Sequence, residues 1–150
     1  MTAPTTNPPS AVRNAALAVW AILGLLVVRV ILTFAMSDAL IDAWVDSNDT
    51  AKSLPRELVE AGAPKYGAVA IGVLVIGVVL ALAVANLAKG ARWARVVVYV
   101  FASLNILGIV VSFLAPSLVA LMVINALVAL LSVAVIVLLS SGEANRHFAR

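Results

Sequence analysis

Four long runs of apolar residues dominate the pattern along the chain. They cover residues 14–36, 66–88, 96–115 and 117–139. Each is long enough for a helix that crosses the hydrocarbon layer of a membrane, which takes about 20 residues. The last three runs contain no charged residue, and the first contains only Arg29. Backbone groups in lipid must be hydrogen-bonded internally and the runs lack the alternation of barrel strands, so the pattern predicts α-helices.

Polar segments divide the chain around these runs. Residues 1–13 are predicted to be a flexible tail, residues 14–140 a single four-helix membrane domain, and residues 141–150 a second, short tail. The first run has a rival interpretation as a cleavable secretory signal, because Ala35 and Ser37 resemble the small residues of a cleavage site. We expect a retained helix, since no Lys or Arg lies in the first ten residues and three further spans follow.

Basic residues in the short connections set the expected orientation. Those on one side lie in the two tails and the second connection: Arg13, Lys89, Arg92, Arg95, Arg146 and Arg150. The first connection, residues 37–65, has fewer basic residues and is acidic overall. The sequence therefore predicts an all-α bundle of four transmembrane helices in the cell (plasma) membrane. Both termini are expected in the cytoplasm, with a helical extracytoplasmic connection between the first two spans.

Composition excludes several classes of protein. Hydrophobic residues make up 64% of the chain and charged residues 11%, which is too little charge for an ordinary soluble domain. Because the chain has no Cys, it holds no disulfide and no thiolate metal site. The net charge of +3 reflects the basic inner side, and no basic surface with interleaved aromatics indicates nucleic-acid binding.

The acidic connection between the first two spans predicts a lid of two short helices. Four aspartates fall within about 80° of one another on a helix that Ser37 would cap: Asp38, Asp42, Asp46 and Asp49. A second helix is expected over Pro55 to Glu60, with Ser53 or Thr50 as its cap, before Gly62 and Pro64.

This outer acidic face has two interpretations. Aspartates four residues apart repel each other, so the stripe could bind a cation or a basic partner. The alternative, which we favour, is a solvated face or pairing with Lys52 and Arg56. The spacing of an EF-hand calcium loop is absent.

The second connection places three cations around one indole: Lys89, Arg92, Trp93 and Arg95. Such a composition suits contact with anionic lipid headgroups on the inner face. A loop that docks a partner protein is the alternative. The short basic C-terminal tail is expected along the same surface.

A charge inside a membrane helix is a candidate functional residue, because burying it unpaired costs several kcal/mol. Arg29, Asn105 and Asn125 lie at similar predicted depths, so we expect them to face inward as one buried polar level. Ser103, Thr33 or Ser132 would lie nearby. Alternatively, Arg29 extends outward to lipid phosphate or to Asp38.

Catalytic chemistry is poorly supported by the sequence. The single histidine, His147, lies in the C-terminal tail and every Asp lies in the first connection, so the predicted topology separates them by the whole membrane. No metal-ligand cluster, phosphate-binding glycine loop or cofactor motif is recognised. We therefore expect neither an enzyme nor a cofactor.

The segment Gly90 to Val97 and the ending Asn145 to Phe148 contain the patterns Gly-x-x-Trp-Ala-Arg and Asn-x-x-Phe. With the overall layout, they resemble a set of uncharacterised small four-helix integral membrane proteins of actinobacteria. The resemblance implies a lineage and a topology, and it implies no activity.

Two classes of function follow. The first is a non-enzymatic integral membrane accessory subunit or scaffold that associates with other membrane protein subunits. The second is a self-associating channel, a holin-like pore or a small transporter, with a polar path near Arg29, Asn105 and Asn125. The spans contain no Asp or Glu, the groups that usually titrate in ion-coupled transport.

Overall fold

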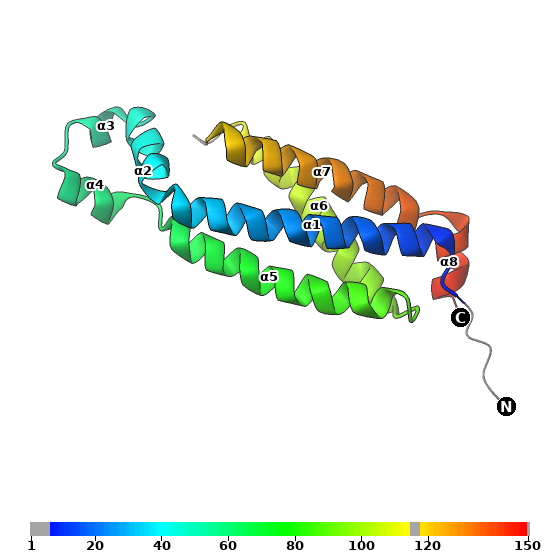
Figure 1. Cartoon of the computed structure of the whole chain (residues 1–150). Helices are drawn as coiled ribbons and strands as arrows, with labels where there is room; N and C mark the ends of the chain where they lie inside the picture. Colours follow the sequence, from blue (N-terminus) through cyan, green and yellow to red (C-terminus); the bar gives the residue numbers. More distant parts are fainter. Residues whose placement is uncertain (1–6, 115–117, 150) are drawn as a thin grey trace.

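Eight α-helices make up the part of the chain that the structure describes, residues 7–114 and 118–149. The structure is a computed structural model, and these described residues contain no β-strand. Four helices are long and lie lengthwise together, while four short helices lie beyond their ends (Figure 1). The predicted all-α fold with four long apolar helices is confirmed.

The long helices coincide with the four apolar runs. They are α1 (Ser10–Ala35), α5 (Tyr66–Leu87), α6 (Arg92–Ser112) and α7 (Val119–Leu139). Each is long and apolar enough to cross a membrane. The predicted boundaries at Ala115 and Ser117, part of the predicted tail (residues 1–6), and Arg150 lie outside the described residues.

Two of the helices begin earlier than their apolar runs. α1 starts at Ser10 and α6 at Arg92, whereas the predicted spans start at 14 and 96. The extensions contain arginines, which end an apolar run but are good helix formers. The hydropathy pattern therefore predicted where each apolar segment begins, and it did not predict where the helix itself begins.

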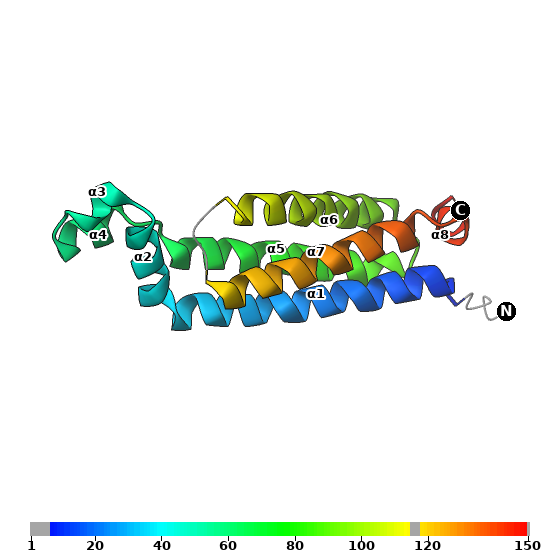
Figure 2. The ribbon, with the colours of Figure 1, turned by 90° about the horizontal axis from the view of Figure 1, so that it is seen from above.

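Each long helix packs against two others. α1 contacts α5 and α7, and α6 contacts the same two helices. The four helices therefore form a ring in which α1 lies diagonally opposite α6. Figure 2 shows this arrangement, with α5 and α7 between α1 and α6.

Apolar side chains cover both the inside and the outside of this ring. Val19, Ile22, Leu80, Val98 and Val135 are almost completely buried in the core. Large apolar side chains also face outward from all four helices, among them Leu17, Val78, Val100 and Val137. A helix that is apolar all round suits a lipid environment, because such a surface exposed to water is an association hazard.

The two ends of the bundle carry different short helices. At the end that we call the lid end, α2 (Ser37–Asp46), α3 (Asp49–Lys52) and α4 (Arg56–Gly62) form the lid (Figure 1). At the opposite end, the terminal end, α8 (Gly142–Phe148) lies near the start of α1 (Figure 1). Polar segments are thus confined to the two ends.

The prediction that all four aspartates share one helix was wrong. α2 ends at Asp46, and Asp49 begins the separate helix α3. The side chain of Asn48 caps α3 by accepting hydrogen bonds from the backbone N–H groups of Thr50 and Ala51, at 3.1 and 3.3 Å. Asparagine is among the best N-cap residues, and here it starts a new helix.

The predicted caps of the lid helices were also wrong. Ser37 is the first residue of α2 and makes no capping hydrogen bond. α4 follows Pro55, which cannot continue a preceding helix, and it has no side-chain cap. The hydroxyl of Ser53 instead donates to the Thr50 carbonyl, within the preceding turn.

Packing around Ala83 gives a test of the bundle. Ala83 is fully buried, whereas Ala85, on the same helix, is exposed. Ala83→Leu is expected to destabilise the protein by about 1–3 kcal/mol, because an added side chain overpacks a close helix contact. Ala85→Leu should leave stability unchanged. Thermal unfolding in detergent measures both variants, and equal midpoints would contradict this packing.

Candidate functional site

A pocket enters the bundle near the lid end, with walls from all four long helices. Its volume is about 230 Å³. Its polar lining comes from Arg29 of α1, Asn105 and Ser112 of α6, and Asn125 of α7. Its apolar lining includes Leu26, Val73, Ile76, Phe101, Leu104 and Ile109. The structure thus brings the three residues of the predicted polar level together around one space.

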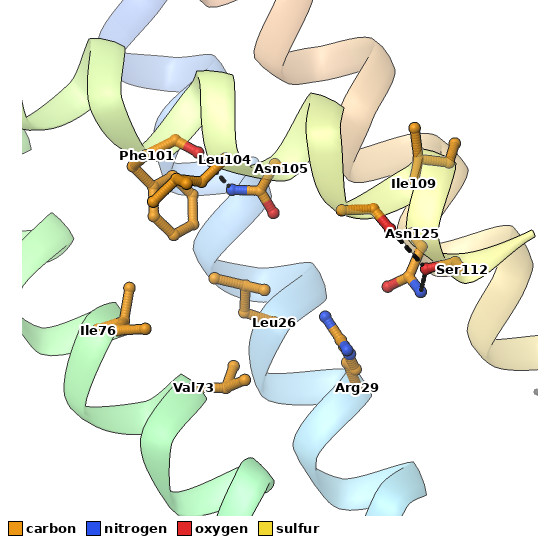
Figure 3. A pocket seen from close by; sticks show the side chains of 11 residues that line it. Leu26, Arg29, Val73, Ile76, Phe101, Leu104, Asn105, Ile109, Ser112 and Asn125 are labelled. Atoms are coloured by element: carbon orange, nitrogen blue, oxygen red, sulfur yellow. Dashed lines mark hydrogen bonds between the residues drawn. The ribbon is translucent and has the colours of Figure 1, made fainter. Parts of the chain in front are cut away.

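Helix geometry explains why these residues meet. Arg29 lies six residues before the end of α1, Asn105 seven before the end of α6, and Asn125 six after the start of α7. At 1.5 Å per residue, each lies roughly 9–11 Å from the lid-side end of its helix. Figure 3 shows Arg29 extending from α1 across the pocket, towards the side where Asn105 and Asn125 lie.

Five polar side chains of the long helices are hydrogen-bonded to the backbone of their own helix. Each donates to the carbonyl four residues earlier, at 2.7–2.9 Å: Thr33, Asn86, Asn105, Ser112 and Ser132. Asn125 donates instead to a neighbouring helix, from its Nδ2 to the Ser112 Oγ at 3.1 Å. This bond joins α7 to the end of α6 (Figure 3).

Arg29 differs from these hydrogen-bonded groups. Its side chain is half-buried, and within residues 7–114 and 118–149 the guanidinium has neither a hydrogen-bond acceptor nor an ion pair. The four long helices contain no Asp or Glu. A cation therefore lies in the pocket without a counter-charge from the described chain.

Ser112 joins the pocket although the sequence did not single it out. It is the last residue of α6, at the edge of an apolar run, where a serine draws little attention. The signal was its spacing of seven from Asn105, which places both on one helix face. Of the expected neighbours, Ser103 is exposed outside the pocket, and Thr33 and Ser132 bond to their own helices.

The core between the pocket and the terminal end is apolar. It is lined by side chains from all four helices, including Val19, Ile22, Leu80, Val84, Val98, Val128 and Val135. The fully buried Ser132 lies among them, and its hydroxyl donates a hydrogen bond to the Val128 carbonyl at 2.7 Å. In the described residues of one chain, the polar pocket therefore does not continue through the bundle.

A second cluster, which we call the tail clamp, holds α8 at the terminal end. The Nη2 of Arg95 donates to the Leu139 carbonyl at 2.8 Å and to the Oδ1 of Asn145. Arg92 donates to the carbonyls of Phe148 and Ala149, at 2.9 and 3.3 Å. Cations that bind the last carbonyls of a helix also interact favourably with the negative end of the helix dipole.

Aromatic contacts complete the tail clamp. The guanidinium of Arg95 lies 5.2 Å from the ring centroid of buried Phe148 and 5.3 Å from that of Tyr99. Gly90 has φ +74°, and a Cβ there would lie 3.3 Å from the His147 carbonyl oxygen. Only glycine suits that turn well. The Gly-x-x-Trp-Ala-Arg and Asn-x-x-Phe patterns are therefore two halves of one contact.

The four residues of the predicted inner contact surface divide into two pairs. Arg92 and Arg95 bind the tail of their own chain, as described above. Lys89 and Trp93 are exposed, and Trp93 retains 50% of its accessible surface. Sequence could not separate the pairs because the partner carbonyls lie about fifty residues away along the chain.

The acidic lid pairs with basic residues of the same connection. Arg56 contacts Asp42 at 2.6 Å and Glu60 at 2.8 Å, and Lys52 contacts Asp49 at 3.0 Å. Hydrogen bonds from Arg56 to Glu60 and Asp42 raise the pKa of the Arg56 guanidinium. Such exposed pairs contribute little to stability. Within the part of the chain that the structure describes, no three His, Cys, Asp or Glu side chains are placed to hold a metal ion.

No protein-family model, no curated protein and no solved structure matches the chain.

The tail clamp yields a direct test. Arg95→Ala leaves the Leu139 carbonyl and Asn145 without their donor, so α8 should lose about 1–3 kcal/mol of local stability. Amide hydrogen exchange in α8 should then accelerate by about tenfold or more. Arg146→Ala is the control, because Arg146 is exposed and bonds only within α8. Equal exchange in the two variants would show that the clamp does not hold α8.

Proposed function

We propose that the chain is a non-enzymatic integral membrane accessory subunit, which associates with a larger membrane protein complex in the cell membrane. The observation that carries the proposal is the pocket at the lid end. It holds a cation to which the described residues give no counter-charge, and an apolar core closes it towards the terminal end. Such a feature suits a docking site, because an unpaired charge in a membrane favours association with a group that compensates it.

A channel or pore is less well supported by the same geometry. A path for ions or polar solutes needs polar groups along its whole length, and the described core offers them only near one end. A ring of several copies would line its lumen with the outward faces of the helices. Those faces carry Leu17, Val78, Val100 and Val137, which are apolar.

The basic and acidic ends support an orientation. The exposed cations Arg13, Lys89 and Arg92 lie at the terminal end, and the acidic residues of the lid lie at the other. By the positive-inside rule we infer that both termini are cytoplasmic and that the lid is extracytoplasmic. Lys89 and Trp93 would then meet anionic headgroups of the inner leaflet.

The tail clamp supports the proposed lineage. The loop pattern and the tail pattern that resemble small actinobacterial four-helix membrane proteins contact each other through Arg95, Asn145 and Phe148. We infer that other chains with both patterns make the same contact, since loss of either half leaves the other half without its contact.

Single cysteines test the orientation, since the chain has none of its own. Leu54→Cys, in the lid, should react with a membrane-impermeant maleimide on intact cells. Ala88→Cys, between α5 and α6, should react only after the membrane is permeabilised. The reverse pattern would invert the proposed topology.

Native mass spectrometry tests the proposed function. The protein is extracted in membrane patches from the cells in which it is made, without prior delipidation. We expect a complex of defined stoichiometry that contains this chain and a different membrane protein. A homo-oligomer with no other protein would contradict the accessory role and favour the pore.

A further inference from the structure

The charge of Arg29 limits what the pocket can bind. A guanidinium in a low-dielectric site needs an acceptor, and a carboxylate or phosphate matches its forked donors best. The described neighbours in the pocket are amides, a hydroxyl and apolar side chains. Their oxygens can accept a hydrogen bond but carry no charge, so a counter-charge for Arg29 has to come from outside the described residues.

The pocket is open on one side, between α5 and α6. Its lining residues there are exposed to the surroundings: Ile76 retains 51% of its surface and Leu104 retains 60%. The lining residues on α1 are more enclosed, and Leu26 is buried. An anion would therefore reach Arg29 laterally, from the lipid side, through the groove that Ile76, Leu104 and Gly108 border.

The direction of the Arg29 side chain favours a carboxylate on a helix over a lipid phosphate. Phosphates lie outside the hydrocarbon layer, beyond the level of Arg29 towards the lid-side end of α1. The side chain of Arg29 extends across the bundle towards Asn105 and Asn125, and not along α1 towards the lid (Figure 3). A side chain from a neighbouring membrane helix reaches that level directly.

A glycine lies at the border of the groove. Gly108 lines the pocket and is exposed, and a Cβ added there would meet no atom within 4 Å. Small residues allow the backbones of two membrane helices to approach closely. A second copy of this chain does not supply the anion from a span, because its long helices lack Asp and Glu.

We propose that Arg29 binds an Asp or Glu side chain on a membrane helix of the partner protein, and that this helix lies in the groove between α5 and α6. This inference rests on the proposed accessory function. The second N–H of the Asn125 amide lies beside the same space and donates to the incoming carboxylate. The groove contacts the partner helix through apolar side chains and Gly108.

Photo-crosslinking in the native membrane tests this contact. A photoreactive residue replaces Leu104 at the groove, and a control replaces Leu130, which faces outward on α7 away from α5. We expect the Leu104 position to capture a peptide from an apolar span that contains Asp or Glu. Changing that acidic residue to Asn or Gln in the partner should abolish the crosslink.

Substitutions at two positions of the groove, Arg29 and Gly108, test the contact further. Arg29→Leu should lower the crosslink yield about tenfold or more, and Arg29→Lys should restore part of it, since the cation returns. Gly108→Leu should block the helix by bulk while the chain still folds, because nothing lies within 4 Å of that site. Gly24→Leu is the matched control, for Gly24 is equally open but lies on α1 outside the pocket lining.

The outcomes separate the inference from the proposed function. A heterologous complex that survives Arg29→Leu, with no crosslink at the groove, would overturn the inference and leave the accessory role intact. A captured phospholipid, a second copy of this chain, or a partner span without an acidic residue would also overturn it. Loss of the complex in Arg29→Leu, with thermal unfolding of that variant unchanged, would support it.

Discussion

The need to satisfy every polar group without water organises this structure. In hydrocarbon, an unpaired backbone or side-chain group costs several kcal/mol, so the spanning segments are helices whose backbones pair internally. The same need explains why Thr33, Asn86, Asn105, Ser112 and Ser132 each bind the carbonyl four residues earlier. Arg29, by contrast, is a charged side chain in a pocket, and the described residues provide no counter-charge for it. Its position is therefore informative about function.

Charge arranges the two ends in different ways. At the terminal end, Arg92 and Arg95 bind carbonyl groups of α7 and of the C-terminal segment, and thereby fix α8 to the bundle. In the lid, Arg56 joins Asp42 of α2 to Glu60 of α4 through exposed ion pairs. The first arrangement is partly buried and combines hydrogen bonds with aromatic contacts, so it is the stronger constraint. The second orders a solvated lid at little energetic gain.

Much of the fold followed from the sequence because apolar length and the absence of charge determine a spanning helix almost alone. The depth of Arg29, Asn105 and Asn125 could be estimated in the same way, since the rise of a helix is fixed. Details at the helix ends could not be predicted in this way. The break at Asn48 depends on one capping side chain, and the Asn125 contact with Ser112 depends on how α6 and α7 pack. The tail clamp joins residues about fifty positions apart, a pairing that no local pattern predicts.

The proposed compensation of Arg29 by a partner carboxylate inside the membrane can be tested with a cryo-EM structure of the complex, purified in lipid from the cells that make it. We expect a helix of another protein between α5 and α6, with an Asp or Glu oxygen within about 3 Å of the Arg29 guanidinium. A groove filled only by lipid, or an Arg29 that reaches a phosphate or Asp38, would contradict it.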